Sequence, residues 1–253
     1  MGVEYKSMDI PGEKSSLIFF DMYESNNLWP EIADLISIYK PTDIVDTFFS
    51  DEEIKNATWL RLVPSFEQGY PEPKPQWPIK QETHELICKK CAIRRQTGSF
   101  RISKEPKLKD NFFMTLVSCG EIFAVPEVFK EFSKNSFSGY EASDVLNHKT
   151  GLPSPMIKQI QILDFANPGL IEDENTQFVD CENCSTRKYL SHMRGMMQVR
   201  KKAFTGQSDF LLSHEWFGSG LIAYHECFIS NRVGRLILNN KWKGVRLKPV
   251  KII

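Results

Sequence analysis

Two short cysteine motifs, Cys88-Lys-Lys-Cys91 and Cys181-Glu-Asn-Cys184, predict how this chain folds. Each motif holds two thiols separated by two residues. A Cys-x-x-Cys turn presents two thiolates to one metal ion from successive backbone corners, and two such turns supply the four ligands of a closed structural zinc site. We therefore expect Cys88, Cys91, Cys181 and Cys184 to bind Zn²⁺.

The second motif begins 93 residues after the first, whereas roughly 15–20 residues separate the two halves of a common zinc ribbon. One shared site therefore requires a fold that brings two distant units together, and a duplicated architecture would do so. Two separate sites, each completed by a histidine such as His84 or His192, are a second arrangement. Two redox-active pairs are a third, but neither motif shows the helix start beside a βαβ pattern that is usual there.

The composition is that of an ordinary globular chain without a charge excess. The 253 residues are 41% hydrophobic and 25% charged, and Lys plus Arg equals Asp plus Glu. General nucleic-acid and membrane-surface binders carry a basic excess, so the zero net charge supports neither class. The length suffices for one large domain or two small ones.

Several features favour a cytoplasmic location. No apolar run approaches the roughly 20 residues that span a bilayer, and the residues after Met1 are not a signal-peptide core. Six cysteines are too few for a disulfide-dense secreted scaffold. In a reducing compartment, paired Cys-x-x-Cys motifs indicate metal binding or redox chemistry.

The segments that follow the two motifs repeat the same order of elements: a strand, a helix, a glycine turn and a final strand. A shift of 105 residues leaves five identities in 23 positions, which are Phe123 on Phe228, Val128 on Val233, Asn135 on Asn240, Gly139 on Gly244 and Val145 on Val250. The motifs are offset by 93, so the second copy carries 12 additional residues between motif and strand. Repeated order together with a repeated motif indicates internal duplication.

We expect an α+β protein in which two related strand–helix–strand units with zinc-knuckle turns follow an N-terminal α+β segment. The predicted boundaries are 1–70 for the N-terminal segment, 71–79 for a Pro-rich linker, 80–150 for the first CxxC unit, 151–172 for a connector and 173–253 for the second CxxC unit. The N-terminal segment contains a helix candidate near Pro30, a capping box at Ser50-Asp-Glu-Glu53 and a strand candidate, Trp59–Val63. Ser230 is a candidate N-cap in the second unit.

The repeated layout over about residues 80–253 resembles a bacterial family, the double-CXXCG proteins. It is similar in layout to polymorphic-toxin immunity proteins, and Ser213–Ser219 and Trp242–Val250 look like the C-terminal segments of the family. The family pattern has a glycine after each second cysteine, where this chain has Ala92 and Ser185. That glycine eases a positive φ, and its absence leaves the thiol ligands in place.

The resemblance implies a zinc-stabilised cytoplasmic immunity protein that binds and neutralises a cognate protein toxin, without a membrane partner. The alternative is a zinc-stabilised nucleic-acid-binding module. The most basic stretch, Arg187–Arg194 continued by Arg200–Lys202, adjoins the second motif and could contact phosphates or an acidic toxin surface. A solvated helix face is the commonest origin of such a run, so we do not expect nucleic acid as the partner.

We expect no catalytic activity. The histidines are scattered, form no metalloprotease pattern with a glutamate, and have no recognisable nucleophile motif nearby. A zinc enzyme would need an open ligand position, whereas four cysteines give a closed site. The stretch Trp216-Phe217-Gly-Ser-Gly220 could form an exposed binding anchor, but we interpret it as packing between the repeats.

Overall fold

The computed structural model describes residues 6–9, 16–20, 22–39, 46–74, 82–173, 176–206 and 208–253. The chain divides into two compact units, Met1–Val45 and Asp46–Ile253. The first unit contains an antiparallel hairpin of β1 (Lys6–Asp9) and β2 (Ser16–Phe19), and the helix α1 (Trp29–Tyr39). The helix predicted near Pro30 is thus confirmed.

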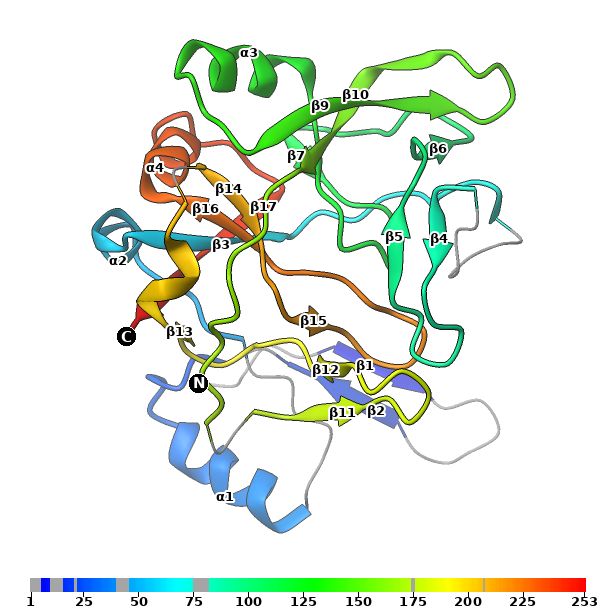
Figure 1. The fold of residues 1–253 in the computed structure, drawn as a ribbon. Coiled ribbons are helices and arrows are strands. Elements are labelled where there is room, and N and C mark those ends of the chain that lie inside the picture. The colour runs from blue at the N-terminus through cyan, green and yellow to red at the C-terminus, as the bar shows by residue number, and fades with distance from the viewer. Residues whose placement is uncertain are drawn as a thin grey trace. The chain divides into compact units, whose positions relative to one another are not determined.

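The second unit is α+β and consists mostly of strands (Figure 1). Within its described residues the helices are α2 (Asp51–Asn56), α3 (Pro126–Lys134), α4 (Asn231–Asn239) and the 3-10 helix η2 (Lys201–Phe204). The strands are β3 (Trp59–Pro64), β4 (His84–Leu86), β5 (Arg94–Gln96), β6 (Arg101–Ile102), β7 (Phe113–Met114), β8 (Phe123–Ala124), β9 (Tyr140–Asn147), β10 (Pro153–Ile162), β11 (Phe178–Asp180), β12 (Arg187–Tyr189), β13 (Met197–Val199), β14 (Phe210–Leu212), β15 (Trp216–Phe217), β16 (Cys227–Ser230) and β17 (Val245–Ile252).

Two sheets of the same design form the body of this unit. Among the described strands, the first sheet has the order β6-β9-β10-β8-β7 and the second has the order β13-β17-β3-β16-β14. In each sheet the central strand is antiparallel to both neighbours. The outer strands β6 and β13 are parallel to β9 and β17. The two sheets therefore share strand order and strand direction.

The shift of 105 residues that aligns the sequence also aligns the structure. It carries α3 onto α4 and β9 onto β17 without a gap. The helix ends match as well, because the backbone N–H of Asn135 donates to Glu131 and that of Asn240 donates to Leu236, each at 3.1 Å. We call residues 80–150 the first half of the unit and residues 173–253 the second half. Each half thus builds the same strand–helix–turn–strand element.

The central strands are exchanged between the halves. Gln159 of β10 lies opposite Phe123 and Ser143, and Arg61 of β3 lies opposite Phe228 and Lys248, which are the equivalent neighbours. Strand β10 precedes the second cysteine motif but completes the sheet of the first half, and β3 precedes the first motif but completes the sheet of the second. The region expected as a connector, 151–172, therefore contains a central strand, as does the N-terminal segment 1–70.

One hydrophobic core joins the two halves. It includes Phe129 and Phe132 of α3 and Val233 and Ile237 of α4, and the two helices lie near each other in Figure 1. Phe132 is fully buried, and its ring lies 5.3 Å from that of Phe210, centroid to centroid. The two halves consequently share this hydrophobic core and do not fold around two separate ones.

Two local predictions have different outcomes. The capping box at Ser50 and Glu53 is present, with both reciprocal hydrogen bonds. Ser230 occupies the N-cap position of α4, but its side chain makes no capping bond. Its hydroxyl donates to the carboxylate of Asp209 at 2.5 Å, and this charge-assisted hydrogen bond holds the side chain at Asp209. Residues 75–79 of the predicted Pro-rich linker lie outside the described residues.

A buried ion pair connects the exchanged strand β3 to the second half. Arg61 binds Glu226 through two contacts, Nη2 to Oε1 at 2.5 Å and Nε to Oε2 at 3.2 Å, and the two side chains are 4% and 6% exposed. Arg61 also donates to the backbone oxygen of His192 at 3.0 Å. The guanidinium thus satisfies a carboxylate that has little access to water.

We expect Arg61→Met to lower the free energy of unfolding by about 3 kcal/mol, because it leaves the carboxylate of Glu226 buried without its cation. Urea denaturation measures the change. The control Lys134→Met removes an exposed pair with Glu131 and should cost less than about 1 kcal/mol. Arg61→Met/Glu226→Leu should recover part of the loss. Equal stabilities of Arg61→Met and wild type would contradict the expectation.

Candidate metal centre

Each cysteine motif forms the tight turn of a short hairpin. The first knuckle hairpin is β4–β5 and the second is β11–β12, both antiparallel. The backbone N–H of Ala92 donates to Cys88 at 2.9 Å, and that of Ser185 donates to Cys181 at 2.7 Å. Ala92 and Ser185 have φ angles of 59° and 57°. The turn therefore needs the left-handed conformation that glycine adopts most readily, although neither residue is glycine.

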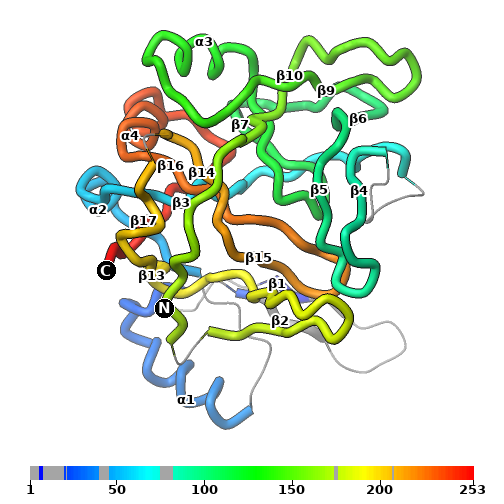
Figure 2. The backbone as a smooth tube through the Cα atoms, viewed as in Figure 1, coloured from blue at the N-terminus to red at the C-terminus, as the bar shows by residue number. Residues whose placement is uncertain are grey.

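The fold brings the two knuckle turns together (Figure 2). The four Sγ atoms of Cys88, Cys91, Cys181 and Cys184 all lie within 4.8 Å of one another. Cys88 is 3.8 Å from Cys181, and Cys91 is 3.6 Å from Cys184. Tetrahedral zinc with Zn–S bonds of about 2.3 Å places its sulfurs about 3.8 Å apart. The cluster has the size of a four-thiolate metal site.

The cluster is enclosed. Cys88, Cys91 and Cys181 are buried and Cys184 is half-buried. Ile93, Ala223 and Trp216 pack against the four cysteines. An apolar enclosure that covers four ligands resembles a closed structural site more than a catalytic one with an open position.

The thiols differ in how readily they ionise. A hydrogen bond from the backbone N–H of Cys91, together with one from the Asn183 side chain at 3.3 Å, lowers the pKa of Cys88 to about 6. Hydrogen bonds from Thr186 lower the pKa of Cys184. Burial raises the pKa of Cys91 to about 12. Cys88 and Cys184 therefore lose their protons more readily than an ordinary cysteine, and a bound cation would favour loss of the proton from Cys91 as well.

Lys188 fixes the backbone around the cluster. Its Nζ donates to three backbone oxygens, those of Cys91 at 2.9 Å, Gly220 at 2.7 Å and Ile222 at 3.0 Å. The residue is 5% exposed, and burial lowers its pKa. Three carbonyl acceptors match the three donors of an ammonium group. One side chain thus ties the first knuckle to the loop after β15.

The cluster contains the four predicted cysteines and no histidine. It is the one group of three or more potential metal ligands in the part of the chain that the structure describes. His84 lies instead beside Glu121, with 3.3 Å between Nε2 and Oε1. Burial lowers the pKa of His192, whose backbone oxygen accepts from Arg61. The remaining cysteines, Cys119 and Cys227, also lie outside the cluster.

The aromatic stretch Trp216-Phe217 packs inside the protein. Strand β15 is parallel to β12, with Trp216 opposite Lys188 and Phe217 opposite Tyr189. Phe217 is 2% exposed, and the Trp216 ring lies 3.8 Å from that of His225. These contacts lie within the second half. The contact between the repeats is made by Trp216, which packs against a cluster that includes Cys88, Cys91 and Ile93. Nothing in the local sequence indicates that Trp216 packs against the cysteine cluster.

The first two of the six cations in the basic run 187–202 make contacts within the fold. Arg187 forms ion pairs with Asp180 at 2.8 Å and Glu172 at 3.0 Å, and its guanidinium stacks on Phe178. Lys188 is buried, as described above. Two cations at the start of the run are consequently committed to internal contacts, which leaves a smaller basic surface than the sequence indicates.

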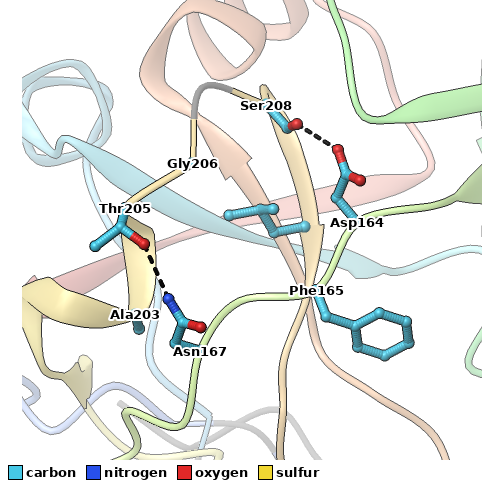
Figure 3. A pocket seen from close by; sticks show the side chains of 8 residues that line it. Asp164, Phe165, Asn167, Ala203, Thr205, Gly206 and Ser208 are labelled. Atoms are coloured by element: carbon cyan, nitrogen blue, oxygen red, sulfur yellow. Dashed lines mark hydrogen bonds between the residues drawn. The ribbon is translucent and has the colours of Figure 1, made fainter.

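A hollow beside β14 is lined by several polar side chains. Its volume is about 300 Å³. Figure 3 shows Ser208 hydrogen-bonded to Asp164 and Asn167 donating to Thr205 at 2.9 Å, while Phe165 points away from both pairs. The polar groups satisfy one another, so the hollow presents no group arranged for catalysis.

Acid should destabilise the protein partly through His225. Burial lowers its pKa from 6.5 to about 4. Between these values the unfolded chain binds a proton that the folded protein excludes, so the free energy of unfolding falls as pH decreases from 6.5 toward 4, by about 3 kcal/mol. Above pH 6.5 this contribution is constant.

The measurement is urea denaturation from pH 4 to 7 on His225→Gln and on His214→Gln, which changes an exposed histidine. Both variants keep the cysteine cluster, so their difference isolates His225. We expect the pH slope to be shallower in His225→Gln alone. Parallel curves would contradict the expectation.

Comparison with known proteins identifies no relative: neither a scan against protein-family models nor a search of curated proteins found a match. In the part of the chain that the structure describes, no helix combines the length and apolar character needed to cross a bilayer.

Proposed function

We propose that the four clustered cysteines bind one structural Zn²⁺ that holds the two halves of a duplicated unit together. The convergence of four thiols from motifs 93 residues apart supports this proposal more than any other observation. Thiolate ligation would contribute folding free energy directly. Zinc suits four thiolates at tetrahedral spacing, whereas Mg²⁺ and Ca²⁺ prefer oxygen ligands.

We further propose that the protein is an immunity protein, which binds a cognate bacterial toxin in the cytoplasm and neutralises it. The basis is the resemblance to double-CXXCG proteins together with an enclosed cysteine cluster and a hydrophobic core that both halves share. A rigid surface loses little conformational freedom on binding, and a metal-joined duplication supplies such a surface. The role rests on this architecture and on analogy.

The test is affinity purification of the wild-type protein from the native host, followed by an activity assay on any captured protein. The control bait is Cys88→Ser/Cys181→Ser, which lacks two ligands of the cluster. We expect a toxin-like protein on the wild-type bait only, and stoichiometric inhibition of its activity. Capture of no toxin-like partner, or of one that stays active when bound, would contradict the immunity role while leaving the zinc site untouched.

A further inference from the structure

The two knuckle hairpins differ in what lies along their second strand. In the second half, β15 runs parallel to β12 and extends the hairpin to a three-stranded sheet. The shift of 93 residues that aligns the cysteine motifs places β5 on β12. Among the strands that the structure describes, however, β5 pairs only with β4, and no counterpart of β15 lies beside it. The two halves therefore differ at this edge of β5.

The difference arises from the length of one connection. The pairing of β7 with β8 is equivalent to that of β14 with β16, with Phe123 and Phe228 at matching positions. From the residue opposite Phe123 the chain takes eight residues, 115–122, to reach it, whereas the corresponding connection to Phe228 takes 16 residues, 212–227. Strand β15 lies within the longer connection. The additional residues thus provide the third strand of the second half.

The exposure of equivalent residues agrees with this difference. Lys188 of β12 is 5% exposed, and its Nζ donates to two backbone oxygens of the longer connection. The equivalent residue of β5 is Arg95, whose side chain is 71% exposed. At the cysteine cluster, Cys91 is buried and its equivalent Cys184 is half-buried. The first half is therefore less covered than the second at matching positions.

The edge of β5 presents backbone hydrogen-bonding groups. The N–H of Thr97 donates to the oxygen of Thr83, on the side of β4, at 2.9 Å. Neighbouring residues of an antiparallel strand direct their backbone groups to opposite sides, so those of Gln96 point away from β4. In the described part of the chain, no backbone group is hydrogen-bonded to them. The equivalent Tyr189 accepts from the N–H of Gly218, directly after β15, at 2.8 Å.

A cavity of about 390 Å³ lies beside this edge. All three residues of β5 line it, and Trp216 and Tyr224 of the longer connection line it from the second half. A strand edge with unpaired backbone groups binds extended segments, which add a further strand to the sheet. Both the space and the backbone groups for an incoming strand are thus present beside β5.

The charges favour an acidic segment. Arg94 and Arg95 both line the cavity, which disfavours a cationic ligand. Arg95 forms an ion pair with Glu85, but both side chains are exposed, and such pairs are weak. A guanidinium has donors for a second carboxylate. In the register of the second half, Trp216 lies opposite Lys188, so the equivalent residue of an incoming strand would lie opposite Arg95.

We propose that the edge of β5 binds an extended segment of a protein partner, parallel to β5 and with an acidic residue opposite Arg95. The segment occupies beside β5 the place that β15 holds beside β12. Main-chain hydrogen bonds to Gln96 provide affinity, and the acidic residue provides selectivity. The inference goes beyond the proposed function, because it concerns how a partner is held, whatever its activity, and the isolated protein suffices to test it.

The probe is a synthetic peptide that copies Ser213–Gly220 with the change Trp216→Glu, which puts an acidic residue opposite Arg95. It is titrated to millimolar concentration while NMR follows the backbone amides of Gln96 and Tyr189. We expect the Gln96 resonance to shift and its N–H to exchange with solvent at least about tenfold more slowly, because the new strand covers it. The Tyr189 resonance should stay in place, since β15 already occupies that edge.

Two control peptides separate the backbone contribution from the charge contribution. The first has N-methylglycine in place of Gly218, the residue whose N–H donates to Tyr189 in the second half. It should bind about fivefold more weakly than the probe, because one hydrogen bond is lost. The second carries Trp216→Lys, which puts a like charge opposite Arg95, and should bind at least about fivefold more weakly.

A charge exchange tests Arg95 directly. The variant Arg95→Glu should bind the lysine peptide at least about fivefold more tightly than the glutamate peptide, which reverses the wild-type order. Lys149→Glu makes the same charge change at an exposed position between β9 and β10 and should keep the wild-type order. The zinc content of each variant is measured in parallel, so a failure here is distinguishable from loss of the cysteine site.

Four results would overturn the proposal. The first is no shift of the Gln96 resonance with the glutamate peptide, and the second is equal binding of the glutamate and lysine peptides. The third is a shift of Tyr189 in place of Gln96, which would mean that the peptide displaces β15. The fourth is slow exchange of the Gln96 N–H before any peptide is added, which would mean that this chain or a second copy already covers the edge.

Discussion

Cys88→Ser and Cys181→Ser are each expected to abolish zinc binding and to cause the largest loss of stability of any substitution considered. Wild-type protein should contain one zinc per chain, since all four Sγ atoms lie within 4.8 Å of one another. Loss of one thiolate from a tetrahedral site removes most of its affinity. Apparent zinc-binding energies of small structural sites are about 10–16 kcal/mol, although here the hydrophobic cores would limit the loss.

The stability change should be visible as a melting temperature at least about 10 °C lower, since about 4 kcal/mol shifts a domain of this size by that amount. Metal analysis and thermal denaturation measure the two effects. Cys119→Ser is the matched control, because Cys119 lies outside the cluster and should keep both zinc and stability. A chelator should reproduce the ligand variants in wild-type protein.

Two outcomes would contradict the structural zinc site. The first is retention of one zinc by both ligand variants. The second is a wild-type protein without metal whose four thiols cycle reversibly between reduced and oxidised forms, which would make redox chemistry the leading interpretation. Zinc loss from only one variant would indicate a site that the two motifs do not share.

The sequence predicts the four cysteine ligands because their signal is local and chemically specific. The choice of Cys88, Cys91, Cys181 and Cys184 follows from the two Cys-x-x-Cys motifs alone. Their convergence on one site depends on tertiary structure, because the motifs lie 93 residues apart. The internal repeat can also be predicted from the sequence, since α3 and α4 have apolar residues at equivalent helical positions. The choice of ligands and the repeat both depend on residue type and spacing alone.

The exchange of central strands could not be predicted in the same way. Strand β10 contains Pro153 and Pro155 and several polar residues, a pattern that reads as a connector. Its partners, β8 and β9, precede it in the chain, and nothing in the strand itself states which sheet it completes. Pairing of this kind is a tertiary property.

Lys188 illustrates the same limit for side chains. In the sequence it belongs to a basic run, which most often is solvated. In the structure it is buried, because three backbone oxygens accept its three protons. Those oxygens belong to distant residues, so neither its burial nor its role beside the cluster follows from local sequence.

The second large effect on stability is expected at the glycine turns, which have the same geometry in the two halves. Gly244 has a φ angle of 100°, and a Cβ atom there would lie 1.9 Å from the backbone oxygen of Phe113. Lys243, the residue before it, accepts hydrogen bonds from the N–H groups of Phe112 and Phe113 at 2.9 and 3.1 Å. The turn of the second half is thus docked directly on the first half.

The equivalent turn makes the reciprocal contact. A Cβ atom at Gly139, where φ is 90°, would lie 2.4 Å from the backbone oxygen of Phe210. Ser138 accepts hydrogen bonds from Asp209 and Phe210 at 3.1 and 3.2 Å. Each glycine turn therefore anchors one half to the first residues of a strand in the other, and neither contact leaves room for a side chain.

Gly244→Ala should lower the free energy of unfolding by at least about 4 kcal/mol, because the methyl group must displace β7 and an L-residue also disfavours this φ angle. Gly139→Ala should cost somewhat less, as its clash is less severe. The control Gly151→Ala shares a positive φ of 72° but has no atom within 4 Å of its Cβ, and should cost about 1 kcal/mol. Denaturant unfolding of the three variants measures the order. If Gly244→Ala were no less stable than Gly151→Ala, backbone strain alone would account for the glycine, and the reciprocal docking of the two halves would not be a source of stability.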